Sequence, residues 1–229
     1  MKNLKTVLVL GLLVICFLAC KENKTDEVTT EQETAAAKET APETTETVTI
    51  TTVLNANLAT EADLNGIGLS ETMVTAIIDN RPFLSMTEFN TVLGSGDHSE
   101  LYKQLFVPFN LNTTAEADFK MIPGVGNKMA HEFEEYRPYL SVKQFEREIG
   151  KYVDEVEVAR YLNYVFVPVE LNSASEEDIK ALPGVGNKMA HEFEEYRPYK
   201  NMDQFRKEIG KYVDDAELKR LERFVYLKN

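Results

Sequence analysis

Between residues 111 and 170 the order of apolar and polar positions predicts four short helices separated by turns. The clearest stretch is 127–136, where apolar side chains recur at helical spacing. Arg137-Pro138 follows it, and the residue before a proline is pushed out of helical geometry. We therefore expect a helix over 127–136 whose buried face carries Met129, Ala130, Phe133 and Tyr136.

Polar residues that can cap a helix predict where the other three helices begin. Serine, threonine or aspartate followed three residues later by glutamate or glutamine is typical of a helix start. Such patterns open at Thr113, Ser141 and Asp154. The three helices are expected to run to Met121, Glu148 and about Asn163. The apolar segment 165–170 is expected to be a connector to the next unit.

This set of elements returns 60 residues later in the chain. The sequence PGVGNKMAHEFEEYRPY occupies 123–139 and, without a single difference, 183–199. Cap patterns return at Ser173, Asn201 and Asp214. A fixed period of this kind means that one supersecondary unit is used more than once.

A weaker copy precedes these two. Residues 57–64 match the pattern of 112–119, and Arg81-Pro82 corresponds to Arg137-Pro138. At the glycine turn, Gly66-Ile67-Gly68 lacks the preceding proline and is interpreted as being followed by two extra residues. The predicted fold is all-α, with a degenerate module at 51–110 and two regular modules at 111–170 and 171–229. Each module is expected to contain four short helices in two hairpins.

Residues 1–19 have the features of a signal peptide. Lys2 and Lys5 give a basic start, and 7–19 is an apolar run too short to span a bilayer comfortably. The run ends in Phe-Leu-Ala-Cys20, which resembles the lipobox of bacterial lipoproteins. The resemblance implies lipidation at Cys20 and attachment to a membrane of the cell envelope, outside the cytoplasm. The alternatives are an ordinary cleaved signal peptide and an uncleaved anchor.

Residues 20–50 consist mainly of Thr, Glu, Lys and Ala. Their apolar content is too low to bury a core, so we expect a disordered tether. Cys16 would leave with the signal peptide and Cys20 would carry lipid, so the mature chain is expected to have no free thiol.

The formal net charge of the chain is −13, and it is unevenly distributed. Residues 51–110 carry −5, 111–170 carry −4 and 171–229 carry −1. Proteins that bind nucleic acid usually have a basic footprint, so this balance argues against broad attraction to DNA. We expect the acidic side chains to lie on exposed helix positions.

The Gly-Val-Gly turn is the strongest candidate for a binding site. Two glycines allow a tight turn with positive φ, and no side chain shields the backbone amides. These amides lie at the start of the following helix, where unpaired N–H groups and the helix dipole favour an anion.

The pattern Leu-Asn, then an apolar residue before Pro-Gly-Val-Gly-x-Lys, resembles the helix-hairpin-helix family, in particular the tandem modules of the DNA-uptake protein ComEA and its relatives. The resemblance covers 51–229 and implies that each module is a pair of helix-hairpin-helix motifs. It also implies that the loops hold phosphates of double-stranded DNA without reading bases. The implied contacts are the N–H groups of Gly124, Val125 and Gly126 with Lys128, and those of Gly184, Val185 and Gly186 with Lys188. Val125 and Val185 are expected to pack inward.

We therefore expect a non-catalytic envelope lipoprotein that binds DNA non-specifically, aided by Lys151, Lys211, Lys219, Arg220 and Arg223. The alternative is a structural or protein-interaction module that presents acidic faces to another envelope protein. In that case the glycines only shape a corner, and Lys128 pairs with Glu132 as part of a solvated helix face.

No catalytic set, cofactor or metal site is expected. His131 and His191 begin His-Glu-Phe-Glu-Glu, but a glutamate stands where a metalloprotease helix has its second histidine. Tyr136, Tyr139, Tyr152 and their copies are expected to serve core and hairpin packing rather than to stack on bases.

Overall fold

The computed structural model describes residues 52–228. The predicted signal peptide, the lipidation site Cys20 and the tether lie outside the described residues. The described part holds twelve helices and six strands of two residues each, so it is mostly helical. None of the helices within 52–228 has the length and apolarity needed to cross a bilayer.

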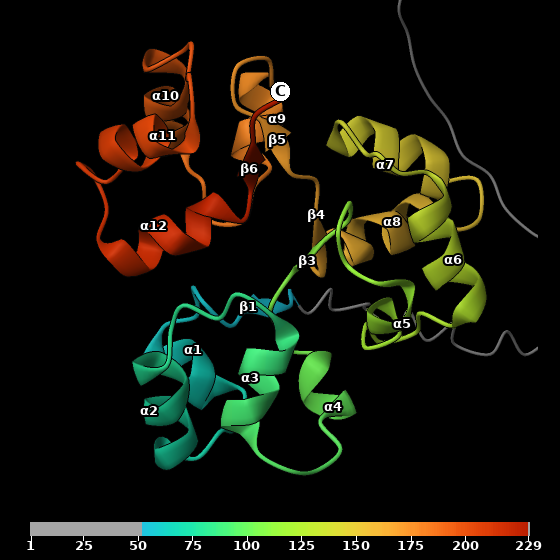
Figure 1. Ribbon diagram of the computed structural model, residues 1–229. Helices are drawn as coiled ribbons and strands as arrows, with labels where there is room; N and C mark the ends of the chain where they lie inside the picture. Colours follow the sequence, from blue (N-terminus) through green and yellow to red (C-terminus); the bar gives the residue numbers. More distant parts are fainter. Residues whose placement is uncertain (1–51, 229) are drawn as a thin grey trace, which may run out of the picture. The chain divides into compact units, whose positions relative to one another are not determined.

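The order strand, four helices, strand occurs three times, and we call these segments the first repeat (54–106), the second repeat (109–166) and the third repeat (169–226) (Figure 1). Each repeat is closed by a parallel pair of its own first and last strands. The pairs are β1 (Leu54–Asn55) with β2 (Leu105–Phe106), β3 (Phe109–Asn110) with β4 (Val165–Phe166), and β5 (Val169–Glu170) with β6 (Val225–Tyr226).

These strands correct the expectation of a purely helical fold. The apolar segment 165–170, predicted as a connector, contains β4 and β5, which pair with strands on opposite sides of it in the sequence. A run of apolar residues this short does not reveal its partner, because the partner of each strand is 56 positions away.

The helices follow the predicted order. The first repeat has α1 (Glu61–Gly66), α2 (Glu71–Asp79), α3 (Met86–Leu93) and α4 (Ser99–Tyr102). The second has α5 (Glu116–Phe119), α6 (Asn127–Glu135), α7 (Val142–Ile149) and α8 (Glu155–Tyr161). The third has α9 (Glu176–Lys180), α10 (Asn187–Glu195), α11 (Met202–Ile209) and α12 (Asp215–Glu222).

Four of the predicted caps are confirmed. The side chains of Ser141, Asp154, Asn201 and Asp214 each accept a hydrogen bond from the backbone N–H three residues later. Such a bond satisfies one of the donors that a helix N-terminus leaves unpaired.

The caps predicted at Thr113 and Ser173 are wrong. The residue before α5 is Ala115, which provides no side-chain cap, and the cap of α9 is Ser175. The segment in front of each helix is held as a turn instead, since the guanidinium of Arg137 donates to the carbonyls of Leu111 and Thr114. Arg197 does the same in the third repeat.

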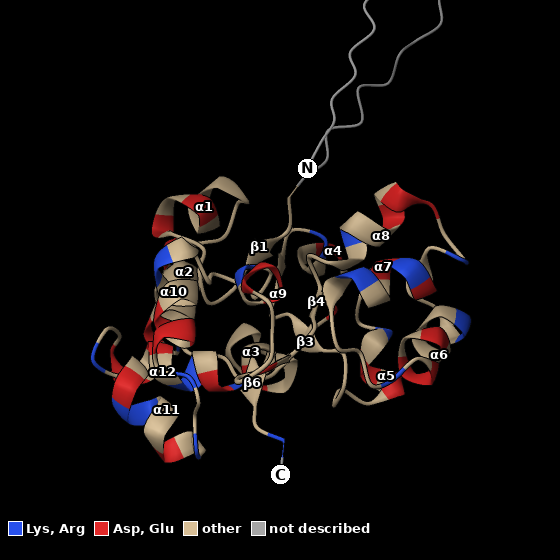
Figure 2. Ribbon diagram, turned by 90° about the horizontal axis from the view of Figure 1, so that it is seen from above, with Lys and Arg blue, Asp and Glu red and all other residues tan. Residues whose placement is uncertain are grey.

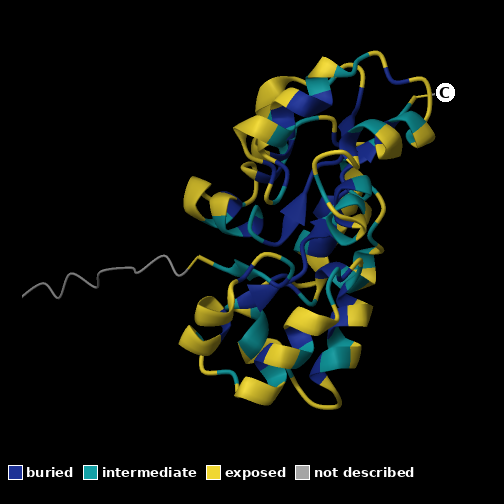
Figure 3. Cartoon of the chain, turned by 90° about the vertical axis from the view of Figure 1, so that its left-hand side faces the viewer, coloured by how far each residue is buried: buried dark blue, intermediate teal, exposed yellow. Residues whose placement is uncertain are grey.

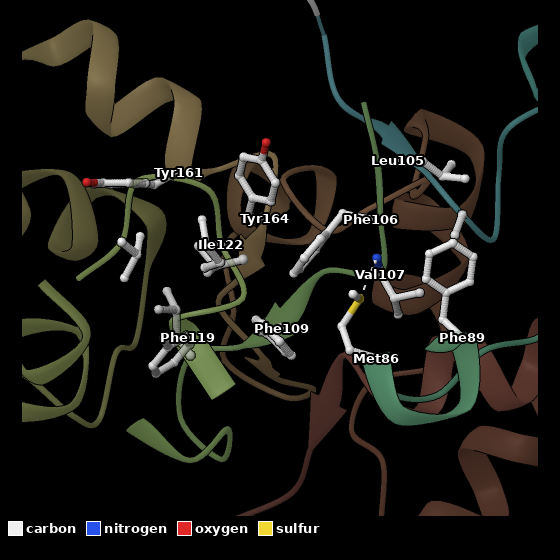
Figure 4. Packing of buried hydrophobic residues seen from close by; sticks show 14 of the residues in the cluster. Met86, Phe89, Leu105, Phe106, Val107, Phe109, Phe119, Ile122, Tyr161 and Tyr164 are labelled. Atoms are coloured by element: carbon white, nitrogen blue, oxygen red, sulfur yellow. Dashed lines mark hydrogen bonds between the residues drawn. The ribbon is translucent and has the colours of Figure 1, made fainter. Parts of the chain in front are cut away.

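The apolar faces of the helices and the strands form the core (Figure 3). The first and second repeats share one hydrophobic cluster. Figure 4 shows Phe106 at their junction, where its ring lies 5.1 Å from that of Phe109 and 5.0 Å from that of Tyr164. The third repeat has a cluster of its own, which includes Phe166 at the end of the second repeat.

Candidate nucleic-acid interface

The turn in front of α6 and the turn in front of α10 have nearly the same backbone. Gly124 has φ of +82° and Gly184 has φ of +73°, in the left-handed region that glycine adopts at little cost. Gly126 and Gly186 are extended and stand at the N-cap positions, where neither contributes a side-chain cap. The glycines of both turns are exposed.

The first amides of α6 and α10 are therefore available to an anion. In the described part of the chain, no hydrogen bond is formed by the N–H groups of Gly124, Gly126, Asn127 and Lys128, and the same holds for their counterparts in the third repeat. Unpaired N–H groups at a helix start carry partial positive charge, which attracts phosphate oxygens.

Val125 and Val185 differ from the other predicted contacts. The N–H of Val125 donates to the carbonyl of Ile122 at 3.0 Å, and that of Val185 donates to Leu182 at 3.0 Å. These two amides already close the turn, whereas within residues 52–228 the amides of the flanking glycines form no such bond, and the phosphate contact by Val125 and Val185 stays a prediction. Their side chains are 6% and 5% exposed, which confirms the predicted inward packing.

Lys128 and Lys188 are exposed and form no ion pair with another residue of 52–228. The predicted partner of Lys128, Glu132, is only 7% exposed and belongs to the interior, as does Glu192. The Lys128 ammonium instead lies 5.7 Å from the ring centroid of Tyr152. The expectation that all acidic side chains lie on exposed helix positions is corrected accordingly.

A tyrosine pair lies beside each hairpin. The hydroxyls of Tyr136 and Tyr152 are 2.8 Å apart, and those of Tyr196 and Tyr212 are also 2.8 Å apart. The hydrogen bond to Tyr136, and then the Glu132 carboxylate, raise the pKa of Tyr152. Of the tyrosines predicted to serve core and hairpin packing, Tyr139 is fully buried in the core, whereas Tyr152 is exposed and contacts Tyr136.

Most of the additional cations predicted to aid DNA binding interact with other groups of the protein. Lys151 pairs with Glu148, and Lys211 pairs with Glu208. Arg220 is 2% exposed; it pairs with Glu217 and donates to the carbonyl of Pro183 at 2.6 Å. The buried Arg220 guanidinium therefore stabilises the turn of the third repeat through its hydrogen bond to Pro183.

Arg223 also has a structural role. Its guanidinium donates to the carbonyls of Phe83 at 3.3 Å and Pro108 at 3.0 Å, and it lies over the ring of Phe166. Burial, followed by the neighbouring Arg220, lowers the pKa of Arg223 to about 10. Of the three tail residues predicted to aid binding, only Lys219 is exposed.

Sequence reasoning missed two cations at the second-repeat turn. Lys103, which follows α4, and Lys120, which follows α5, line a shallow hollow of about 470 Å³ together with Ser99 and the residues 121–126. Lys103 pairs with Glu100 at 2.6 Å on the surface. The spacing of Lys103 in the sequence gave no signal, because it belongs to the preceding repeat.

In the first repeat, the helix after the corresponding turn has a side-chain cap. Gly68 has φ of +82°, and α2 begins directly after Ser70, so no extra residues follow the turn. The Ser70 side chain accepts from the N–H of Met73 at 3.3 Å. A serine cap thus occupies the place of Gly126 and satisfies a donor that the other two repeats leave free.

Acidic and basic residues are interspersed along the chain (Figure 2). Acidic residues occur on helices of all three repeats, whereas α7, α11 and α12 carry two Lys or Arg each and the helices of the first repeat carry none. Within 52–228, three or more His, Cys, Asp or Glu side chains are nowhere grouped so that they could hold a metal ion. His131 contacts the Glu116 carboxylate at 3.3 Å.

A comparison with protein families matches residues 165–226 to the helix-hairpin-helix motif. The matched segment runs from β4 to β6 and contains the Gly184 turn and α10. No match was found among curated proteins, and none among solved structures. The third repeat therefore contains a helix-hairpin-helix motif, a motif that commonly binds nucleic acid.

Proposed function

We propose that this chain binds double-stranded DNA without sequence preference, through phosphates held at the turns before α6 and α10. The observation that carries the proposal is the pair of uncapped helix starts, each preceded by an exposed glycine turn and followed by a lysine without an ion-pair partner in the described residues. Backbone amides can hold a phosphate of any sequence, because the phosphate carries no base identity.

The proposal includes the architecture of the chain. The second repeat has the same turn sequence, element order and strand closure as the matched third repeat, and the first repeat shares the order and closure. We infer three tandem modules, each a pair of helix-hairpin-helix motifs, of which the first is degenerate. The resemblance to ComEA, lipidation at Cys20, a location in the cell envelope and the lack of catalytic activity belong to the same proposal.

Fluorescence anisotropy of the full-length chain with a labelled duplex would test DNA binding. If about four phosphates are contacted, log K should fall with log salt at a slope near −3.6. Two duplexes of unrelated sequence should give the same affinity. No binding at low salt would contradict the proposal.

The double variant Lys128→Glu/Lys188→Glu is expected to abolish binding. Its control is Lys143→Glu/Lys207→Glu, which changes the net charge by the same amount at exposed positions of α7 and α11. Equal losses in the two double variants would mean that only overall charge matters and that the hairpins are not the site.

A second candidate is a structural or protein-interaction module of the envelope. The net charge of −13 and the use of Arg220 and Arg223 inside the protein favour it. It predicts no retention on DNA at any salt concentration. It also predicts a protein partner that co-purifies equally with the wild type and with the Lys128/Lys188 variant.

A further inference from the structure

We propose that the two hairpins of identical sequence are not equivalent. In this proposal, which rests on the proposed DNA binding, the second-repeat turn is the principal phosphate site and is completed by Lys103 and Lys120. The third-repeat turn is restricted by Leu58, which the first repeat places against Gly184.

The second-repeat turn is open and has several cations around it. Lys103 and Lys120 line the hollow that contains Pro123–Gly126. Lys120 is exposed, and it forms no ion pair within residues 52–228. The pair of Lys103 with Glu100 is exposed on both sides, and such surface pairs contribute little, so the ammonium can turn to a phosphate. A phosphate here would meet backbone amides and the ammonium groups of Lys103, Lys120 and Lys128.

The third-repeat turn has only one of these two cations. The counterpart of Lys103 is Asn163, and the counterpart of Lys120 is Lys180, which forms an exposed pair with Glu176 at 2.5 Å along α9. A methyl carbon of Leu58 lies so near Gly184 that a Cβ built there would be 2.7 Å from it. The nearest atom to a Cβ at Gly124 is a guanidinium nitrogen of Arg160, at 3.3 Å. A guanidinium nitrogen of Arg220 would lie 3.0 Å from the Cβ at Gly184, so both turns have an arginine beside them and the methyl groups of Leu58 are the difference between them.

Leu58 is unusual for its position. It follows Asn57, and the residues after the corresponding asparagines are Thr113 and Ser173. Leu58 is 41% exposed, so only part of its apolar surface is buried. Its contact with the Gly184 turn distinguishes it from the polar residues at the corresponding positions of the other repeats. Replacing it by serine restores the residue type that the repeat otherwise uses.

The identical hairpins provide matched variants. Anisotropy of the full-length chain with labelled duplex would compare Lys128→Gln with Lys188→Gln at several salt concentrations. Removing a lysine that contacts a phosphate lowers the salt slope by about 1. We expect this loss for Lys128→Gln, Lys120→Gln and Lys103→Gln, and a smaller loss for Lys188→Gln. In a Leu58→Ser background, Lys188→Gln should lower the slope as much as Lys128→Gln does.

The outcomes separate this inference from the proposed function. Equal effects of Lys128→Gln and Lys188→Gln, with binding intact in the wild type, would overturn the inequivalence and leave DNA binding standing. An effect of Lys188→Gln that does not change in the Leu58→Ser background would overturn the role of Leu58. A wild-type chain that does not bind the duplex would overturn both proposals.

Discussion

Asn112 and Tyr139 are 27 residues apart and exchange two hydrogen bonds. The Asn112 side-chain amide donates to the Tyr139 carbonyl at 2.8 Å, and the Tyr139 N–H donates to the Asn112 side-chain oxygen at 2.7 Å. Asn172 makes both bonds with Tyr199, and Asn57 makes both with Phe83. The asparagine thus fastens the entry of each repeat to the segment that follows its second helix.

Replacing Asn112 by alanine should therefore destabilise the protein. The change leaves a half-buried N–H and a carbonyl without partners, which costs about 1–3 kcal/mol. Asn187→Ala, at an exposed position of α10, is the control and should have little effect. Urea unfolding followed by circular dichroism measures both. Equal stability of the two variants would show that the exchange of hydrogen bonds contributes nothing.

Two glycines at helix ends should respond in opposite ways to alanine. A Cβ at Gly150 would lie 2.6 Å from the carbonyl oxygen of Glu146, whereas a Cβ at Gly66 would have no atom within 4 Å. Gly150→Ala should lower the free energy of unfolding by about 1–3 kcal/mol, because the backbone must shift. Gly66→Ala should raise it by about 0.4–1 kcal/mol, because it restricts the unfolded chain. Thermal unfolding of both variants would check the contrast.

The residues at the N-cap positions of α5 and α9 can be exchanged between the second and third repeats as a matched pair of variants. Ser175 caps α9, and its counterpart before α5 is Ala115, which provides no cap. Ser175→Ala should destabilise the protein by about 1 kcal/mol, since it removes a side-chain acceptor. Ala115→Ser should add such an acceptor and stabilise by a similar amount. Chemical denaturation would measure the pair, and a shift of the same sign in both variants would contradict the explanation.

His131 should titrate above the ordinary value of histidine. The hydrogen bond to Glu116 raises the pKa of His131. Because the folded-state pKa is raised, the stabilisation is fully present below the unfolded-state value of about 6.5 and is lost as pH rises through the folded-state value. NMR titration should show the His131 pKa falling in Glu116→Gln. An unchanged pKa in that variant would contradict the contact.

Local features were predictable from the sequence, because their causes are local. Ser141 and Asp154 cap helices through residues three positions away, and Gly124 has the positive φ that a tight turn requires. The cap at Thr113 was mispredicted because Arg137, which follows α6 at the far end of the same hairpin, holds the carbonyls on both sides of it.

Features that depend on distant partners could not be predicted. Helical spacing places Glu132 and Arg220 among polar residues, yet both side chains are buried by groups from other elements. The strand pairs join residues 51 or 56 positions apart, and nothing in two apolar residues identifies the partner. The surroundings of the two candidate hairpins could not be predicted either, because Lys103 and Leu58 belong to the first repeat and lie beside hairpins of the second and third repeats.

The parallel strand pairs have a consequence for how such a chain can lengthen. The entry and exit of each repeat run side by side in the same direction, and two residues separate each exit from the start of the next repeat. A gene duplication that copies the 60 codons between any point of the second repeat and the same point of the third adds a unit with both of its strands. The boundaries of the duplicated DNA therefore need not coincide with those of the folded unit, and the identity of 123–139 with 183–199 is what a recent event of this kind would leave.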